Sequence, residues 1–174
     1  TLASSQPISL SHRVQRVKPS PTLAITALAA ALRSEGKDII GLGAGEPDFD
    51  TPEPIKQAAI QAIESGFTKY TAVDGIPSLK QAVVDKFKRD NGVSYALDQV
   101  MVSCGGKQAF YNLCQALLNE GDEVLIPAPY WVSYPDIVML ADATPVTISA
   151  GIEQQFEITP EQLEAAITPR TRLF

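Results

Sequence analysis

Short apolar runs alternate with helical patterns from residue 100 to the end of the chain, and this alternation restricts the fold more than any other feature. The apolar runs are VMVSC, EVLIP, TPVTIS and the residues after PRT, and the helical patterns cover 106–119, 133–140 and 159–167. Apolar runs rich in β-branched residues and separated by helices are typical of βαβ units. We therefore expect an α/β fold with a mainly parallel sheet covered by helices on both faces.

The residues before 100 predict an N-terminal arm, three helices and a further strand. Residues 1–19 show no steady period. Helical spacing of apolar residues, with prolines at the starts and glycines at the ends, predicts helices that begin at Pro21, near Pro52 and at Pro77. The short apolar run after Asp38 predicts a strand, and the loop GLGAGEPDFDTP follows it.

Composition and charge exclude several classes of protein. The 174 residues are 45% hydrophobic and 20% charged, as expected for a globular protein with a buried core. A net charge of −6 argues against nucleic-acid binding. Cys104 and Cys114 are too few for a disulfide framework, and a single histidine, His12, leaves no metal-binding spacing. With neither a secretory signal nor an apolar run long enough for a membrane span, we expect reduced thiols and a cytoplasmic location.

The stretch VMVSCGGKQAFYNL combines a predicted strand, two glycines and a helix. Backbone N–H groups at the start of a helix lack intrahelical acceptors and carry the positive end of the helix dipole, so they attract anions. Gly105 and Gly106 allow close approach of a phosphate, and Lys107 adds a positive charge. An ordinary strand-to-helix turn with a solvated lysine would have the same local sequence.

Three further segments contain candidate binding residues, each with a purely structural alternative. Gly45 lies in a glycine- and proline-rich loop that either binds a carboxylate or connects two substructures. Trp131 follows the apolar strand EVLIP and either stacks on a flat ligand or packs in a core. Tyr70 could hydrogen-bond an anion or be an ordinary loop residue. On local sequence alone, Lys18 is a cation in a linker and Ser20 caps the start of a helix.

Together, GLGAGEPDFDTP, TKYTAVDGIPSLKQAV, CGGKQAFYNL and PYWVSYP resemble, in this order, the N-terminal portion of class I pyridoxal-phosphate aminotransferases. The likeness is greatest to the bacterial-type aspartate aminotransferases. It implies the type I pyridoxal-phosphate transferase fold and a homodimer with shared active sites. It also implies that residues 1–45 form the arm and a segment of a smaller domain, and that 46–174 form the first half of a large cofactor-binding domain.

The same resemblance implies roles for residues that bind the cofactor, pyridoxal 5′-phosphate. The backbone of Gly105, Gly106 and Lys107 holds the phosphate in this family. Trp131 matches the aromatic residue that stacks on the pyridine ring. Tyr70 matches a tyrosine that reaches the phosphate of the neighbouring subunit's cofactor.

The resemblance also implies a set of substrate-binding residues. Gly45 matches a glycine whose main chain helps to hold the α-carboxylate, and Trp131 lies at the same site. Lys107 and Ser20 match positions that recognise an acidic side chain, and Lys18 matches one linked with acceptance of prephenate. The implied substrates are small amino acids and 2-oxo acids.

We expect no catalytic residue in this segment. Transamination requires a lysine that forms a Schiff base with the cofactor aldehyde. Lys107 would face the phosphate end of the cofactor, so we expect that lysine beyond Phe174, and we expect this chain to be one piece of a longer polypeptide.

The function implied is transfer of the amino group of aspartate to a 2-oxo acid such as 2-oxoglutarate. Alternatives within the family are a preference for prephenate, aromatic substrates or alanine. Alternatives from other classes are a pyridoxal-phosphate-binding sensor domain of a transcriptional regulator and an anion-binding module without catalysis.

Overall fold

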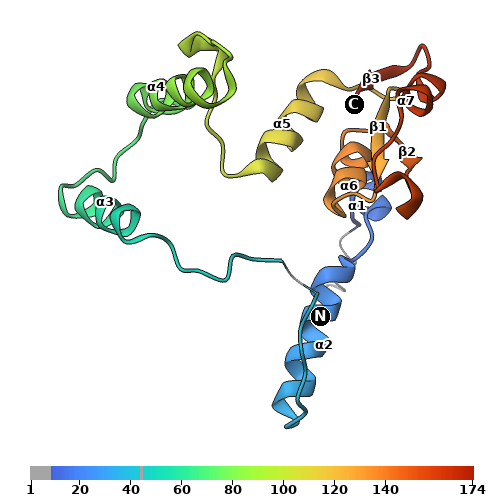
Figure 1. The fold of residues 1–174 in the computed structure, drawn as a ribbon, viewed down its shortest axis with the longest axis horizontal. Coiled ribbons are helices and arrows are strands. Elements are labelled where there is room, and N and C mark those ends of the chain that lie inside the picture. The colour runs from blue at the N-terminus through green and yellow to red at the C-terminus, as the bar shows by residue number, and fades with distance from the viewer. Residues whose placement is uncertain (1–8, 44) are drawn as a thin grey trace, which may run out of the picture. The chain divides into compact units, whose positions relative to one another are not determined.

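The structure, a computed structural model, describes residues 9–43 and 45–174 (Figure 1). The first part of the predicted arm and Ala44 of the glycine-rich loop lie outside the described residues. The chain forms two compact units, one made of Thr1–Ala24 with Gly105–Phe174 and the other of Ile25–Cys104. The predicted division into domains near residue 45 concerns the whole protein and stays a prediction.

The first unit contains the parallel sheet. The central strand β1 (Glu123–Ala128) pairs with β2 (Thr144–Ser149) on one side and β3 (Thr171–Leu173) on the other, and both pairings are parallel (Figure 1). The helices between and before the strands are α5 (Gly106–Leu117), α6 (Ser133–Leu140) and α7 (Pro160–Ala166). This order confirms the predicted α/β fold with its alternation of strands and helices.

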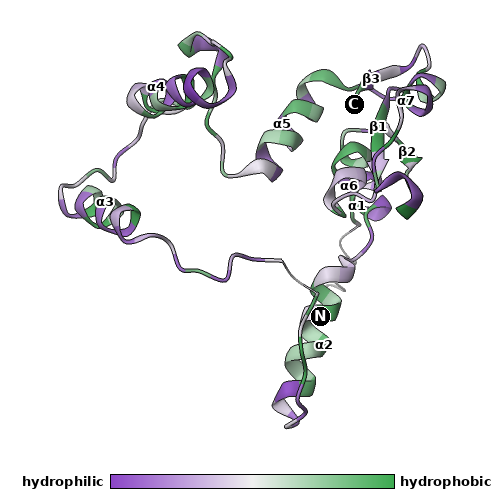
Figure 2. Cartoon of the chain, in the orientation of Figure 1, coloured by the Kyte–Doolittle hydropathy of each residue, from purple (hydrophilic) through white to green (hydrophobic). Residues whose placement is uncertain are grey.

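The core of this unit forms where α5 and α6 meet the central strand. β1 has four consecutive buried residues, 123–126, because it lies between two neighbouring strands. Val138 of α6 and Cys114 of α5 are fully buried and belong to one cluster with Val124 and Ile126. Figure 2 shows the hydrophobic character of β1. Coverage of both sheet faces by helices stays a prediction.

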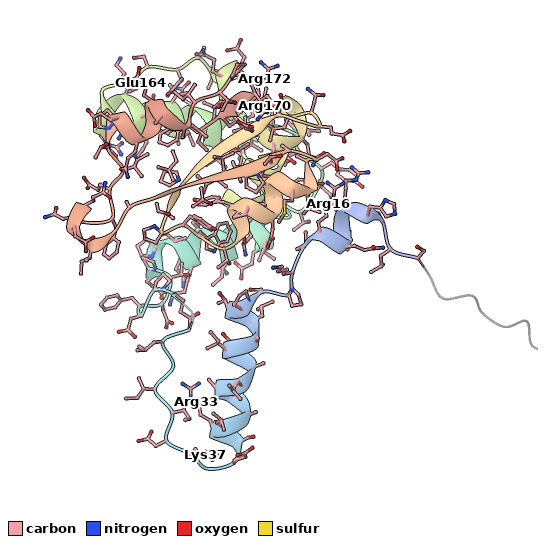
Figure 3. All side chains as sticks on the ribbon, turned by 90° about the vertical axis from the view of Figure 1, so that its right-hand side faces the viewer. Arg16, Arg33, Lys37, Glu164, Arg170 and Arg172 are labelled. Carbon is pink, nitrogen blue, oxygen red and sulfur yellow. The ribbon has the colours of Figure 1, made fainter. Side chains whose placement is uncertain are left out.

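A buried carboxylate holds the edge strand β3 against β1. Glu123 is 7% exposed, and it accepts hydrogen bonds from Thr168 Oγ1 at 2.6 Å and from Arg170 Nε at 2.8 Å. Its backbone N–H also donates to the Arg170 carbonyl at 2.8 Å (Figure 3 labels Arg170). The hydrogen bonds from Thr168 and Arg170 lower the pKa of Glu123.

The predicted helices before residue 100 are present. They are α2 (Pro21–Ser34), α3 (Glu53–Glu64) and α4 (Pro77–Lys86). α4 continues as one π-helical turn, Phe87–Asn91, which ends at Gly92 in the left-handed conformation with φ 69°. The remaining short elements are the 3₁₀ turns Leu97–Gln99 and Ile152–Gln154. No helix in the described ranges is long and apolar enough to cross a bilayer.

Two local predictions were wrong. The runs 38–42 and 100–104 form no strands, and Ile40 and Leu42 are 85% and 91% exposed. A strand requires a hydrogen-bonded neighbour, whereas the Val102 N–H donates to the Asp74 carbonyl in a turn. The segment predicted as an arm contains a short helix, α1 (His12–Arg16), which begins at the capping side chain of Ser11.

Candidate functional site

The glycine turn before α5 combines an unusual backbone conformation with a helix start. Gly105 adopts φ 85° and ψ 170°, a conformation that side-chain-bearing residues avoid, and α5 begins at Gly106. A Cβ added at either glycine would meet no atom within 4 Å, so both glycines border open space. The Ala109 N–H donates to the Gly105 carbonyl at 3.2 Å. The N–H groups of Gly106 and Lys107 lie earlier in the first turn of α5, where N–H groups have no intrahelical acceptor.

Lys107 and Trp131 come together at this end of the unit. The Lys107 ammonium lies over the Trp131 ring, 4.8 Å from its centroid, which is a cation–π contact. Trp131 remains 41% exposed, so its indole is open to solvent as well as to Lys107. The pair presents a positive charge beside a flat aromatic surface, and this combination suits a planar anionic ligand.

Two aromatic contacts orient Trp131. Its ring meets Tyr134 edge-on at a centroid distance of 5.5 Å, and Tyr134 meets Phe110 of α5 edge-on at 5.3 Å. The Tyr134 N–H donates to the Trp131 carbonyl at 3.0 Å, which joins the tryptophan to the first turn of α6. The sequence patterns assign no role to Tyr134 or Phe110. Tyr134 follows Trp131 by three residues, and this spacing is the signal from which a contact of Tyr134 with Trp131 could be predicted.

The position of Trp131 follows from the sheet. It comes three residues after the carboxyl end of the central strand β1, where ligands of parallel α/β sheets bind. A cavity of about 560 Å³ borders this region. Its lining is almost entirely apolar and includes Phe110, Leu113, Trp131, Tyr134, Leu173 and Phe174. A second depression lies at the starts of α5 and α6, and its lining includes Lys107, Gln108, Ser133 and Asp136.

Ser20 and Lys18 lie in the segment between α1 and α2. The Ser20 hydroxyl accepts from the Leu23 N–H at 3.5 Å, so Ser20 has the predicted capping position at the start of α2. Lys18 is exposed. Arg16, two residues before Lys18, donates to Asp142 at the end of α6 at 2.9 Å (Figure 3 labels Arg16). This ion pair links α1 to the end of α6.

Tyr70 and Gly45 belong to the other compact unit. Tyr70 is fully exposed at 107%, and Gly45 is exposed with no atom within 4 Å of a Cβ added there. Of the predicted site residues, the structure thus brings together Gly105, Gly106, Lys107 and Trp131. The roles of Tyr70, Gly45, Ser20 and Lys18 stay predictions.

Residues 37–174 match the model of the family "Aminotransferase class I and II". The aspartate/prephenate aminotransferase of Nitrosomonas europaea is 65% identical over 167 residues, which cover 96% of this chain and 42% of that protein. The chain therefore spans less than half the length of this relative.

Two solved structures have the same fold over nearly the whole chain. The aspartate aminotransferase of Rhizobium meliloti superposes with a TM-score of 0.91 at 52% identity, covering 95% of this chain and 42% of that one. The aspartate aminotransferase of Thermus thermophilus with maleate gives a TM-score of 0.91 at 49% identity, covering 95% of this chain and 44% of that one. Sequence and fold agree, and the chain belongs to the class I and II aminotransferase family.

Proposed function

We propose that the full-length protein is a pyridoxal-phosphate-dependent aminotransferase that passes the amino group of aspartate to a 2-oxo acid such as 2-oxoglutarate. The observation that carries this proposal is the open glycine turn at the start of α5 with the Lys107 ammonium over Trp131. The chain that contains this arrangement is 65% identical to the Nitrosomonas europaea aspartate/prephenate aminotransferase over the shared length.

The residues of the glycine turn fit the phosphate of pyridoxal phosphate. A phosphate needs several N–H donors at close range, and a Cβ at position 105 or 106 would fill the open space in front of them. The amides of Gly106 and Lys107 supply donors at the positive end of the α5 dipole. The Lys107 ammonium adds a full positive charge next to this turn.

Trp131 fits the ring of the same cofactor. Its indole is partly exposed and is oriented by the edge-on contact with Tyr134, so it offers a flat surface on which a ring can stack. When bound, pyridoxal phosphate supplies an electron sink for the charge that develops at the substrate Cα. The residues of this chain bind and orient the cofactor. We assign the Schiff base to a lysine in a part of the full-length protein that these 174 residues do not include.

We assign substrate recognition to Lys107, Ser20, Gly45 and Trp131. A side-chain carboxylate that leaves water must be paired with a cation or with several donors, and Lys107 and Ser20 supply these. The Gly45 backbone would hold the α-carboxylate. The Thermus thermophilus aminotransferase was solved with maleate, a four-carbon dicarboxylate of the size of aspartate, which supports a dicarboxylate substrate.

Prephenate is a second candidate acceptor. The relatives from Nitrosomonas europaea and Cereibacter sphaeroides, 65% and 63% identical, are both aspartate/prephenate aminotransferases. Prephenate carries a ring carboxylate in addition to its 2-oxo acid, so it also requires a cation in the substrate site. Lys18 is exposed and carries the charge for this role.

We further propose a homodimer in which Tyr70 hydrogen-bonds the phosphate in the neighbouring subunit, and a cytoplasmic location. Full exposure of Tyr70 is compatible with a role outside its own compact unit. Both cysteines are thiols, Cys104 exposed and Cys114 buried, which suits a reducing compartment.

The proposal is tested with the purified full-length protein and pyridoxal phosphate. Aspartate with 2-oxoglutarate should give glutamate, and aspartate with prephenate should give arogenate if the second acceptor is used. Alanine and phenylalanine serve as neutral amino donors. A cofactor-loaded protein that forms no glutamate from aspartate, but does so from a neutral donor, would overturn the assignment of aspartate.

A further inference from the structure

A buried lysine is paired with an aspartate four residues after Tyr70. Lys80 of α4 is only 8% exposed, and its ammonium is paired with the carboxylate of Asp74. A buried ammonium without a partner costs several kcal/mol, so Lys80 holds Asp74 in place. The Lys80 hydrogen bond also lowers the pKa of Asp74 and keeps the carboxylate ionised.

The backbone at Asp74 and Gly75 is fixed by a second set of contacts. The Asp74 carbonyl accepts from the Val102 N–H at 3.0 Å. Gly75 has φ 106°, and a Cβ added there would lie 2.6 Å from Val102 Cγ2 and 3.6 Å from Lys80 Cγ. The turn after Tyr70, the first turns of α4 and the segment before the glycine turn therefore meet at one point.

The contacts around Asp74 and Gly75 determine the conformation of the Tyr70 loop, because Tyr70 itself makes little side-chain contact. Tyr70 is fully exposed and Val73 is 98% exposed, so side-chain packing does not place either residue. The next fixed point along the chain is the Ala72–Gly75 turn, in which the Gly75 N–H donates to the Ala72 carbonyl at 3.2 Å. A shift of the Asp74 carboxylate would move this turn, which is the fixed point that follows Tyr70 in the chain.

We propose that Lys80 and Asp74 are positioning residues that hold the Tyr70 loop in the conformation required for cofactor binding. This inference rests on the proposed function, because it takes the phosphate of pyridoxal phosphate as the partner of Tyr70. Neither Lys80 nor Asp74 touches the cofactor in this scheme. Their effect on cofactor affinity is expected to pass through Tyr70, whereas an effect that passes through Val102 would add to that of Tyr70→Phe.

The test is a double-mutant cycle on the full-length protein. Pyridoxal phosphate is titrated into the cofactor-free protein, and its Kd is measured for Asp74→Asn, Tyr70→Phe and the double variant. Loss of a hydrogen bond to a charged group corresponds to about a tenfold to hundredfold increase in Kd for Tyr70→Phe. We expect Asp74→Asn to raise Kd in the same range and the double variant to be no weaker than Tyr70→Phe.

Three further variants separate positioning from general loss of structure. Lys80→Arg keeps the charge and should retain wild-type affinity, whereas Lys80→Met keeps the buried aliphatic stem and should match Asp74→Asn. Lys56→Met is the matched control, because it removes the exposed ion pair of Lys56 with Glu53 at 2.9 Å on α3 of the same compact unit. Hydrogen exchange of residues 68–75 in the cofactor-free protein should accelerate in Asp74→Asn and remain unchanged in Lys56→Met.

The outcomes are distinguishable from failure of the proposed function. Additive effects of Asp74→Asn and Tyr70→Phe on Kd, or an Asp74→Asn protein with unchanged Kd, would overturn the inference while leaving the aminotransferase assignment intact. An unchanged Kd in Tyr70→Phe would also overturn it, because Tyr70 would then have nothing to position. A wild-type protein that binds no pyridoxal phosphate would overturn the proposed function itself. Asp74→Asn decides the matter if Lys80→Met fails to fold, because the side chain at position 74 is 50% exposed and the asparagine amide oxygen can still accept a hydrogen bond from the Lys80 ammonium.

Discussion

Replacement of Gly106 by alanine should separate cofactor binding from fold stability. A Cβ at this position meets no protein atom within 4 Å, and the residue is the first of α5. Alanine therefore fits the free protein without strain. Because glycine is the more flexible residue in the unfolded chain, the substitution should leave stability unchanged or raise it by about 0.4 to 1 kcal/mol.

The same Cβ occupies the space that we assign to the phosphate. If it removes one charge-assisted hydrogen bond from the backbone, the loss is about 1.5 to 3 kcal/mol, equivalent to a Kd raised by about tenfold to just over a hundredfold. Gly106→Val, with two more carbons, should weaken binding further. The assay is titration of the cofactor-free, full-length protein with pyridoxal phosphate, alongside thermal unfolding of the same samples.

Gly105→Ala provides the matched comparison. Gly105 has φ 85° with ψ 170°, so alanine there strains the backbone by about 1 to 3 kcal/mol in the free protein. We expect Gly105→Ala to lower both the melting temperature and cofactor affinity, whereas Gly106→Ala lowers affinity alone. A Gly106→Val protein with wild-type Kd and an intact fold would refute the assignment of the phosphate to this turn.

Three other predictions concern separate parts of the first unit. With cofactor saturating, Lys107→Ala should lower kcat/KM for aspartate by about tenfold to a hundredfold through loss of a charge-assisted hydrogen bond, while sparing phenylalanine. An equal loss for both donors would reject Lys107 as the specificity residue. Glu123→Gln should destabilise the protein at neutral pH and reduce the acid dependence of its stability, measured by denaturant unfolding. The Glu123 pKa is lowered from its ordinary value of 4.5, so its contribution is complete above pH 4.5 and falls away as the pH drops toward the folded pKa; an acid dependence equal to that of wild type would contradict this. Burial raises the pKa of the Cys114 thiol, so peptide mapping after treatment with a thiol reagent should find Cys114 modified only in the unfolded protein. Rapid modification in the native state would show that α5 opens readily.

Local sequence determined most of the elements. α6 and β2 have the predicted bounds, 133–140 and 144–149, and α5 begins at the predicted Gly106. Their signals are short-range, because helical or strand periodicity and the glycine, proline and capping residues at the ends all act within a few positions. The glycine turn was predictable for the same reason, since a helix start and its N–H groups are local features.

Non-local contacts decided which apolar runs became strands and which side chains came together. VMVSC and the run after Asp38 have strand-like composition, but a strand exists only with a hydrogen-bonded neighbour, and the Val102 N–H binds a turn instead. The contact of Lys107 with Trp131 joins residues 24 positions apart through the packing of α5 beside α6. The pairing of buried Lys80 with Asp74 likewise depends on packing around Gly75, which lies next to both Val102 and the Lys80 stem. Sequence therefore determined which residues could bind an anion, a ring or a charge. Tertiary structure decided which of these residues meet, because burial and distance depend on packing between segments, and local sequence patterns do not encode that packing.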